Sequence, residues 1–346
     1  MFLKNTWYVG AWAHEVPAGK LFTRTLLGVP VLFWRDSQDQ VVAVRDRCPH
    51  RGAPLSKGRL EADGVRCMYH GMKFDSQGDC IEIPGQERMP PGACVERFKV
   101  VQRHNWLWIW MGDEALADED LIPNAYWLDS AQWRYIPDYM HYQVDYLLIA
   151  DNLLDFSHLP FVHEKTLGGN SLDYAALRPE IERIDNGLKV SRWHMDAPPA
   201  PFVTNITHWT DNVDRWNIYD FLVPGVLLMD SGSAPAGSGA REGNRDKAVE
   251  FRSAQALTPE TATTTHYFFS QAHNFSLDDR TVTEKLHGTL VAGFKEDWEI
   301  IHAQAATLAL DPDFKMTPLN VDSALGYFRA LMAKRISSET SFSVAA

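Results

Sequence analysis

The sequence lacks an excess of positive charge, a long apolar run and an export signal, and each absence excludes a class of proteins. Its 346 residues carry a formal net charge of −12 at pH 7, whereas binding nucleic acid needs a basic surface. No run approaches the roughly 18 apolar residues of a membrane-spanning helix. The start of the chain has no uninterrupted apolar segment of the kind that a signal peptide carries. We therefore expect a cytoplasmic protein that binds neither nucleic acid nor membranes.

A dinucleotide-binding glycine motif is also missing. No G-x-G-x-x-G follows a strand pattern, and Gly237-Ser238-Gly239 lies in a polar segment with no helix signal after it. The chain is therefore not expected to bind NAD(P)H or flavin itself. It does have enough length for two domains, and its 45% of apolar residues excludes a disordered protein.

Two short motifs that each combine one Cys with one His stand in the first third of the chain. They are Cys48-Pro49-His50 and Cys67-Met68-Tyr69-His70. Thiolate and imidazole ligands suit zinc, iron or an iron–sulfur cluster. Zinc fingers usually pair Cys with Cys and His with His, whereas each motif here supplies one of each. The mixing favours a two-iron, two-sulfide (2Fe–2S) centre in which one iron takes both Cys and the other both His, the Rieske arrangement. A zinc site is the alternative.

The first domain, residues 1–115, is expected to consist of strands. Segments rich in β-branched and aromatic residues alternate there with turn signals, as in an all-β domain. An acidic segment that ends near Pro123 is the expected linker to a second domain. The clearest expected strands are Thr6–Trp12, Val29–Arg35, Val41–Arg45 and Trp106–Met111.

The second domain, residues 116–346, is expected to mix helices with strands. Asp185-Asn186-Gly187 is a strong hairpin turn, and a helix over residues 145–157 is expected to end before Pro160. Residues 230–246 are rich in Gly, Ser, Ala and Pro and predict a surface loop or a lid over a pocket. The other expected elements are strands Glu180–Ile184, Leu188–Trp193, Trp216–Leu222, Ala248–Leu257 and Thr263–Phe269, and helices Thr281–Leu310 and Asp322–Arg335.

A second group of metal-ligand residue types lies in and just beyond the helix expected over residues 145–157. Asp151, Asp155 and His158 recur at i, i+4 and i+7 and would therefore share one helix face. His163 follows the break at Pro160 and can fold back toward His158. Two His and one carboxylate on one face of Fe(II) leave positions open for O₂. The segment therefore predicts two ligands of a mononuclear iron site.

The missing carboxylate is sought on the helix expected over residues 281–310. The apolar stripe of this helix consists of Leu286, Leu290, Phe294 and Ile301. Asp297 falls inside that stripe, whereas Glu296 and Glu299 lie off its centre. A carboxylate that faces a core needs a partner, which Fe(II) would supply. Pairing of Asp297 with a hydroxyl or an amide is the alternative.

Taken together, the motifs resemble those of the Rieske non-haem iron oxygenases. The matching patterns are C-P-H-R-G…C-x-Y-H-G, D-x-x-H-x-x-x-x-H and K-E-D-x-x-x-I, and the resemblance covers nearly the whole chain. It is greatest to the toluenesulfonate methyl-monooxygenase, vanillate O-demethylase and dicamba monooxygenase group. The resemblance implies an α+β fold, with an N-terminal all-β Rieske domain and a C-terminal helix-grip catalytic domain built on an antiparallel sheet.

The resemblance also implies roles for individual residues. The cluster ligands would be Cys48, His50, Cys67 and His70, and the ligands of the mononuclear Fe(II) would be His158, His163 and Asp297. Asp155 would then not bind iron. It would bridge a cluster His and an iron His between subunits of a head-to-tail homotrimer, because a carboxylate bonded to a ligand His fixes its tautomer. Asn152 is expected near the iron.

The implied activity is that of a terminal oxygenase component. A separate flavin and 2Fe–2S reductase would deliver electrons from NAD(P)H, and oxygen from O₂ would be inserted into a methyl or methoxy substituent of an aromatic acid. A hydroxylated methoxy group collapses to a phenol and formaldehyde. The alternatives are cis-dihydroxylation of the ring and, in a different class, a Rieske electron carrier. A carrier gives no reason for the second metal site.

Several polar residues remain without a role. Arg192, Arg215 and His208 are candidates for contacting an anionic group, although a surface or hairpin position is favoured for each. Cys80 and Cys94 are expected to be buried thiols that serve packing.

Overall fold

The computed structural model describes residues 1–167 and 172–343, which form two compact units. The first unit comprises residues 1–124 with 258–262, and the second comprises 125–257 with 263–346. The division at Asn124 falls just after Pro123, at the end of the linker expected from the sequence. The boundary between functional domains expected after residue 115 stays a prediction.

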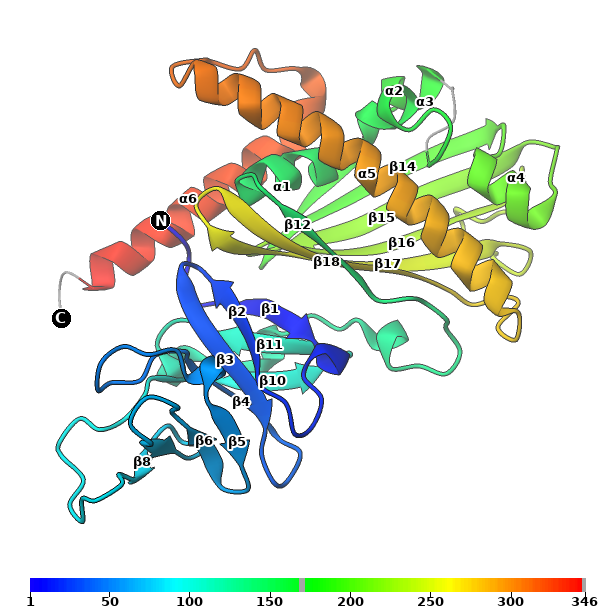
Figure 1. Ribbon diagram of the computed structural model, residues 1–346. Helices are drawn as coiled ribbons and strands as arrows, with labels where there is room; N and C mark the ends of the chain where they lie inside the picture. The colour runs from blue at the N-terminus through cyan, green and yellow to red at the C-terminus, as the bar shows by residue number, and fades with distance from the viewer. Residues whose placement is uncertain (168–171, 344–346) are drawn as a thin grey trace. The chain divides into compact units, whose positions relative to one another are not determined.

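Three antiparallel sheets build the first unit (Figure 1). Their strand orders are β1-β11-β10, β2-β3-β4-β9 and β5-β6-β7-β8. The four strands expected from the sequence are confirmed as β1, β3, β4 and β11. The strands are β1 (Trp7–Trp12), β2 (Phe22–Leu26), β3 (Val29–Arg35), β4 (Val41–Arg45), β5 (Arg59–Glu61), β6 (Gly64–Arg66), β7 (Lys73–Phe74), β8 (Cys80–Glu82), β9 (Arg97–Phe98), β10 (Val100–Arg103) and β11 (Trp106–Trp110).

Two hydrophobic clusters fill the first unit. One lies between β1, β2, β3 and β11 and is formed by residues such as Tyr8, Phe33 and Ile109. The other contains Trp34 and Phe74 and also Cys48, Cys67 and Cys80. Both sulfurs expected to bind the cluster are therefore part of a packed core rather than of a surface loop.

A seven-stranded sheet forms the centre of the second unit, in the order β12-β18-β17-β16-β15-β14-β13. Strands β13 to β17 pair with their neighbours in antiparallel fashion, as do β12 and β18. The hairpin expected at Asp185-Asn186-Gly187 is confirmed between β13 and β14. The strands are β12 (Asp138–Tyr142), β13 (Glu180–Ile184), β14 (Gly187–Ala197), β15 (Val213–Leu222), β16 (Val226–Pro235), β17 (Val249–Thr261) and β18 (Thr264–His273).

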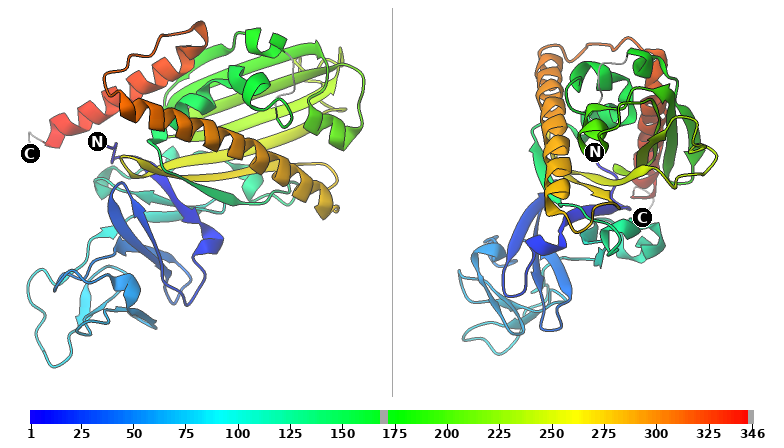
Figure 2. Two further views of the ribbon diagram at one scale, coloured as in Figure 1. Left: turned by 45° about the horizontal axis from the view of Figure 1, so that its top comes forward. Right: turned by 90° about the vertical axis from the view of Figure 1, so that its right-hand side faces the viewer.

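Helices lie against this sheet. The longest, α5 (Arg280–Leu310), packs on β18, and α6 (Ser323–Ser343) packs on β14. Helix α1 (Tyr146–Leu154) contacts both of them and lies between them in Figure 2. The buried face of α5 contains the expected stripe of Leu286, Leu290, Phe294 and Ile301, together with Asp297. The short helices are α2 (Leu159–Val162), α3 (Leu172–Ala176) and α4 (Pro201–Thr207).

Two expectations for the second unit were wrong. The helix expected over residues 145–157 ends at Leu154, because the Asp155 carboxylate accepts hydrogen bonds from the backbone N and Oγ of Ser157 and begins a separate 3-10 turn, η6 (Phe156–His158). Residues 230–235 are not loop but the end of β16, where Trp216 Nε1 and two arginines bind the Asp230 carboxylate. The lid expected over residues 230–246 stays a prediction for the rest of that segment.

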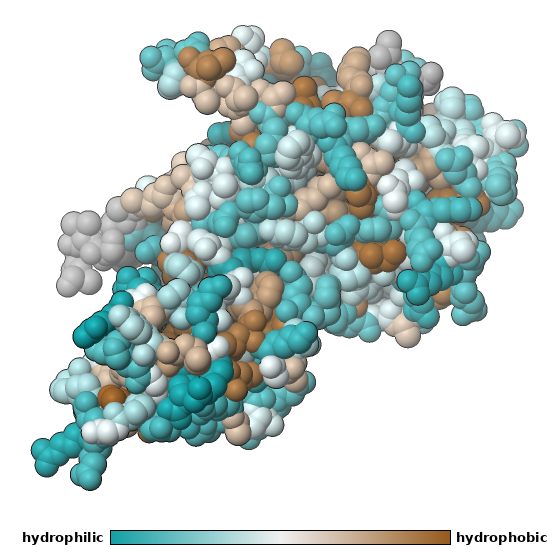
Figure 3. Space-filling model, in the orientation of Figure 1, coloured by the Kyte–Doolittle hydropathy of each residue, from teal (hydrophilic) through white to brown (hydrophobic). Residues whose placement is uncertain are grey.

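The visible face of the molecule in Figure 3 is mostly polar. On the face shown in Figure 3, hydrophilic residues cover most of the area and hydrophobic residues occur in small groups. Among the described residues, no helix is both long and apolar enough to span a bilayer.

Candidate metal centres

The two Cys-and-His motifs form two backbone turns of the same kind. In the first, Cys48 N donates to Ala53 O and Gly52 N donates to Cys48 O, at 2.8 and 2.9 Å. In the second, Cys67 N donates to Met72 O and Gly71 N donates to Cys67 O, at 2.8 and 3.1 Å. Each turn contains a Gly at positive φ, +72° at Gly52 and +78° at Gly71, a conformation that side chains disfavour. The sequence thus folds each motif into a rigid loop that presents one Cys and one His.

The side chains of these turns divide by burial. Cys48 and Cys67 are each 2% exposed, whereas His50 and His70 lie on the surface with their ring centroids 4.5 Å apart. Burial and the neighbouring Cys67 sulfur raise the pKa of the Cys48 thiol. Two buried thiolates this close together need a compensating positive charge, which iron supplies. The set therefore has a buried sulfur side and an exposed imidazole side.

The donor set fits a group larger than one ion. Within residues 1–167 and 172–343, the only three His, Cys, Asp or Glu side chains whose ligand atoms lie within 4.8 Å of one another are those of the second site. The four atoms of the first site therefore do not converge on one point, as the ligands of a zinc site would. A cluster with two irons, one held by sulfur and one by nitrogen, matches this arrangement.

Arg66 supports the second turn. Its Nη1 donates to the carbonyl oxygen of Gly71 at 2.7 Å, and its guanidinium pairs with Glu61 and Glu82. Hydrogen bonds from Arg66 and then Arg59 lower the pKa of Glu61 to about 2. The carboxylates stay charged at neutral pH and hold the Arg66 side chain in position. Arg66 in turn holds the loop that carries His70 through its bond to Gly71.

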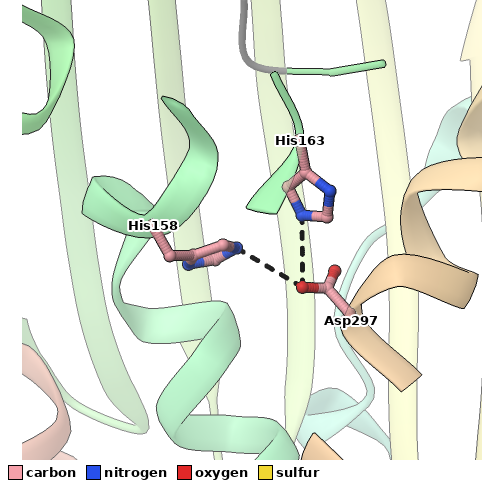
Figure 4. A group of neighbouring side chains, drawn as sticks. All are labelled: His158, His163 and Asp297. Carbon is pink, nitrogen blue, oxygen red and sulfur yellow. Dashed lines mark ion pairs between the residues drawn. The ribbon is translucent and has the colours of Figure 1, made fainter. Parts of the chain in front are cut away.

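Three separate elements of the second unit bring the second set of donors together. His158 ends the η6 turn, His163 follows α2, and Asp297 lies in the middle of α5. His163 Nε2 is 3.1 Å from Asp297 Oδ1, and His158 Nε2 is 3.5 Å from the same oxygen. Figure 4 shows both imidazoles turned toward that carboxylate. The expectation that these three residues meet is therefore met in the geometry, although His158 does not share a helix face with Asp151 and Asp155.

The other nitrogen of each imidazole has its own oxygen partner. His158 Nδ1 lies within hydrogen-bond distance of the Asp155 carbonyl oxygen, and His163 Nδ1 is 2.8 Å from Glu296 Oε2. With Nδ1–H donating to these oxygens, Nε2 is left as a lone pair that faces the Asp297 carboxylate. This is the tautomer that binds a metal, and an oxygen partner on the remote nitrogen is the usual support of such a ligand.

Glu296 is a functional candidate that the sequence did not point to. Periodicity placed it off the apolar stripe of its helix, and its side chain is partly exposed. It is nevertheless held in place, because Thr166 Oγ1 donates to the same Oε2 at 2.6 Å. Its role is evident only from its contacts with the loop after α2, and only the folded chain brings that loop to α5.

Burial and charge act differently on the two imidazoles. Burial lowers the pKa of His158, which keeps its ring neutral and able to bind a metal. Burial also acts to lower the pKa of His163, but the hydrogen bonds that its ring donates to the Asp297 and Glu296 carboxylates outweigh burial and raise that pKa. The surroundings of His163 thus favour a positive charge at this position, and a metal cation would supply one.

The remaining residues of this segment separate into different environments. Asn152 Nδ2 donates to Asp297 Oδ1 at 2.9 Å, so it lies at the site as expected. Asp155 is partly exposed and lies one turn away, with its carboxylate on Ser157. Asp151 forms an ion pair with Arg329 of α6 and lies outside the site. These different environments show that Asp151, Asp155 and His158 do not share the one helix face expected from their spacing.

A cavity opens directly beside the three donors. Its wall consists of α1, η6 and α5 on one side and strands β15 to β18 on the other. Most of the lining is apolar, and the polar groups are few. The lining side chains include Phe156, Phe202, Trp216, Met229, Leu290 and Phe294 among the apolar ones, and Arg215, Asn217, Ser231, Ser253 and Gln271 among the polar ones.

Two of the three cations considered from sequence are not on the surface. Arg192 and Arg215 are only 4% and 8% exposed, because both side chains point to the inner face of the sheet. His208 is exposed and ends α4 with φ +58°, as its surface assignment predicted. Cys80 is buried as expected, but Cys94 is exposed, so its expected packing role was wrong.

Two family models match the chain. The Rieske 2Fe-2S domain matches residues 6–99, and the vanillate O-demethylase oxygenase C-terminal domain matches residues 142–338. Each site described above thus lies inside one of the two matches.

Relatives and a solved structure are similar over nearly their whole length. The iron-sulfur subunit of the toluene-4-sulfonate monooxygenase system of Comamonas testosteroni is 48% identical over 98% of each chain. The vanillate O-demethylase oxygenase subunit of Pseudomonas sp. (strain HR199 / DSM 7063) is 32% identical over 98% of this chain and 96% of its own. A crystal structure of dicamba monooxygenase with non-haem iron and dicamba has a TM-score of 0.84 at 29% identity, covering 98% of this chain and 99% of that one.

Proposed function

The chain belongs to the Rieske non-haem iron oxygenases, and from this premise we propose which residues carry out its activity. It is the terminal oxygenase component of a multi-component monooxygenase, whose cofactors are a Rieske 2Fe–2S cluster and a mononuclear non-haem iron. We assign the cluster to Cys48, His50, Cys67 and His70 and the mononuclear iron to His158, His163 and Asp297. The observation that carries the proposal is the convergence of these last three donors at the wall of a mostly apolar cavity.

The protein's own contribution at the second site is to present donors in the correct state. Glu296 and the Asp155 carbonyl oxygen fix the tautomers of the two imidazoles, and Asn152 donates to the Asp297 carboxylate. Two imidazoles and one carboxylate occupy one side of an iron and leave other positions open. When bound, the iron supplies activation of O₂, which no protein side chain provides.

The cavity suits a small aromatic acid. Aromatic and aliphatic side chains line most of it, so an aromatic ring placed there loses water and gains packing contacts. The ring then lies beside the three donors, and the substituent nearest to them is the one oxidised. We propose that this substituent is a methyl or methoxy group, as the names of the relatives indicate for those proteins. The activity would serve the degradation of aromatic compounds.

Electron delivery involves other polypeptides. A separate NAD(P)H-dependent reductase reduces the protein, and we place both in the cytoplasm. We further propose a homotrimer in which Asp155 meets His70 of the partner subunit. The exposed His50 and His70 rings and the partly exposed Asp155 carboxylate are accessible for such contacts. A carboxylate between two ligand imidazoles fixes both orientations.

Product analysis tests this function. The purified protein is reconstituted with iron, NADH and a flavin/ferredoxin-type reductase, and is offered toluenesulfonate, methylbenzoates and methoxybenzoates. Products are identified by mass spectrometry beside a formaldehyde assay. A benzylic alcohol establishes methyl hydroxylation, and a phenol with formaldehyde establishes O-demethylation. A product heavier by two oxygens and two hydrogens would instead establish ring dihydroxylation. No product, with only the cluster irons bound, would leave an electron carrier.

A further inference from the structure

Arg192 is a buried cation for which the described part of the chain supplies no counter-charge. It lies on β14 and is 4% exposed, and its Nε and Nη1 have no hydrogen-bond partner. No carboxylate of the described residues forms an ion pair with it. Removing a guanidinium from water is costly, and buried charges are nearly always paired. The side chain therefore indicates that something outside the chain completes its surroundings.

The register of the sheet shows which way Arg192 points. It is directly opposite Asn217 on β15, and Asn217 is directly opposite Ser231 on β16. Directly paired residues of antiparallel strands share a face. Asn217 and Ser231 both line the cavity beside the three donors. Arg192 therefore lies on the cavity side of the sheet, one strand beyond the cavity wall.

A second buried guanidinium lies next to the first. Arg215 lines the cavity itself, and its Nη2 donates to the carbonyl oxygen of Leu167 at 3.1 Å. The ring of Tyr174 contacts both arginines, with its centroid 5.3 Å from Arg192 Cζ and 5.1 Å from Arg215 Cζ. The Tyr174 hydroxyl donates to Asn217 Oδ1 at 2.9 Å. Arg215 and Asn217 are therefore polar parts of the cavity wall, and Tyr174 and Arg192 pack next to them outside the lining.

Packing on an aromatic ring is not sufficient to explain the burial of Arg192. A cation–π contact offsets only part of the cost of burying a guanidinium, and one ring here serves two cations whose charges repel. An anion with two or three oxygens, bound beside Arg215, would remove the repulsion and accept hydrogen bonds. Ser253, whose buried Oγ has no partner, is a further donor in the same cavity.

Resting on the function proposed above, we propose that Arg215, Arg192 and Asn217 form the subsite for the acid group of the substrate, a sulfonate or carboxylate. Arg215 contacts the anion directly. Arg192 does not contact it, but its positive charge lies next to Tyr174 and Asn217 and attracts the anion. With the acid group held here, the ring lies along the apolar walls and the opposite substituent faces His158, His163 and Asp297. The subsite thereby selects aromatic acids and decides which carbon is oxidised.

The outer surface supports the same charge preference. A second hollow shares Phe202 with the cavity and is lined by Lys165 and Lys285, both exposed. The chain as a whole carries a net charge of −12, which repels anions. Two lysines beside Phe202 raise the local concentration of an anion at this point of the surface.

Ligand pairs that differ only in charge test the subsite. The reconstituted full-length protein is titrated calorimetrically with 4-toluenesulfonate and with the neutral 4-toluenesulfonamide, for the wild type, Arg215→Gln and Arg192→Gln. Arg183→Gln is the matched control, because Arg183 is an exposed arginine of the neighbouring strand β13. Arg215→Gln should weaken sulfonate binding by about 10–100-fold and sulfonamide binding by less than about 3-fold. Arg192→Gln should act in the same direction with a smaller factor, and the control should change neither.

Equal losses for both ligands, or none, would overturn the subsite. If the arginine variants do not fold, the wild type alone decides, because equal affinity for sulfonate and sulfonamide contradicts the proposal. Product formation is followed separately. Charge-selective binding without any oxygenated product would refute the proposed function and leave the subsite standing. Oxygenated product without charge selectivity would do the reverse.

Discussion

The two metal sites of this chain are built in opposite ways. The four donors of the Rieske site lie on two neighbouring turns of the first unit, and their positions follow from local hydrogen bonds between backbone groups. The three donors of the second site come from a 3-10 turn, a residue after a short helix, and the middle of α5. Their positions follow from the packing of helices on a seven-stranded sheet.

The difference in construction matches a difference in access. The His50 and His70 imidazoles are exposed, as their proposed role in a cluster that exchanges electrons with another protein requires. The second site is enclosed, with His163 only 1% exposed and a cavity beside it. A site held by local turns can sit at a surface without losing its geometry. A site that must exclude water and hold a substrate needs walls from several elements.

The strongest test of whether the two metal sites are independent is Asp297→Ala. Removing the carboxylate should release the mononuclear iron, so that bound iron falls from about three to about two atoms per chain and product formation falls by at least about 1,000-fold. The visible and EPR spectra of the cluster should not change, because the two sites share no backbone element. Iron analysis and EPR on the same sample measure both.

Glu299→Ala is the control for that experiment, since Glu299 lies on the same helix and is exposed. It should keep all iron and nearly all activity. Loss of the cluster signal in Asp297→Ala would contradict the independence of the two sites.

The two motifs of the local site stood out in the sequence, whereas the residues that meet at the second site were evident only in part. Cys48 and His70 stand in motifs whose spacing alone restricts the chemistry. Asp297 was found because a long helix has a regular period, and a polar residue inside its apolar stripe is conspicuous.

What the sequence did not give depends on contacts between distant segments. The helix ends early because the Asp155 carboxylate accepts a hydrogen bond from Ser157 N and caps the 3-10 turn that follows. Hydrophobic periodicity does not reveal such a local hydrogen bond. Glu296 looked like a surface residue until the loop carrying His163 was placed against it. Arg192 and Arg215 looked like hairpin or surface residues, because strand alternation does not say which face of a sheet encloses a cavity.

The next test asks whether the sites communicate. Asp155→Asn keeps an oxygen that accepts from Ser157 N, and its amide nitrogen can donate to Ser157 Oγ, so the fold and both metals should remain. If Asp155 joins the sites between subunits, steady-state product formation should still fall by about 100-fold. Rapid-mixing measurements of cluster oxidation should show the slowed step, whereas reduction of the cluster by the reductase should be unchanged. Turnover at the wild-type rate in this variant would refute the bridging role.

Glu296→Gln tests the support of one ligand. The amide cannot match the carboxylate as an acceptor for His163 Nδ1–H, so iron should bind about 10–100-fold more weakly. Iron-loading curves of the metal-depleted protein, followed by recovery of activity, measure this, and at saturating iron most of the activity should return. Glu299→Gln, three residues along the same helix, should load like the wild type. Identical loading of both variants would contradict a positioning role for Glu296.

The smallest effect is expected at the turn that holds His70, and it probes how local the Rieske site is. Gly71 has φ +78°, and an added Cβ would lie 2.7 Å from Cγ of Pro84, a ring that cannot move aside. Gly85, fourteen residues further along the chain, has φ +74° with nothing within 4 Å of an added Cβ. Both Ala variants share the cost of the left-handed backbone, roughly 1–2 kcal/mol, and only Gly71→Ala adds a clash of about 1–3 kcal/mol.

Denaturant unfolding followed by the cluster absorbance should therefore give a lower free energy of unfolding for Gly71→Ala than for Gly85→Ala. The difference should be about the 1–3 kcal/mol of the clash. Binding of iron to the metal-depleted second site should be equal in the two variants. If Gly71→Ala also weakened iron binding at His158, His163 and Asp297, the first unit would be helping to shape the second site. The two sites would then differ in how their donors are positioned, but the stability of the second site would depend on the first unit.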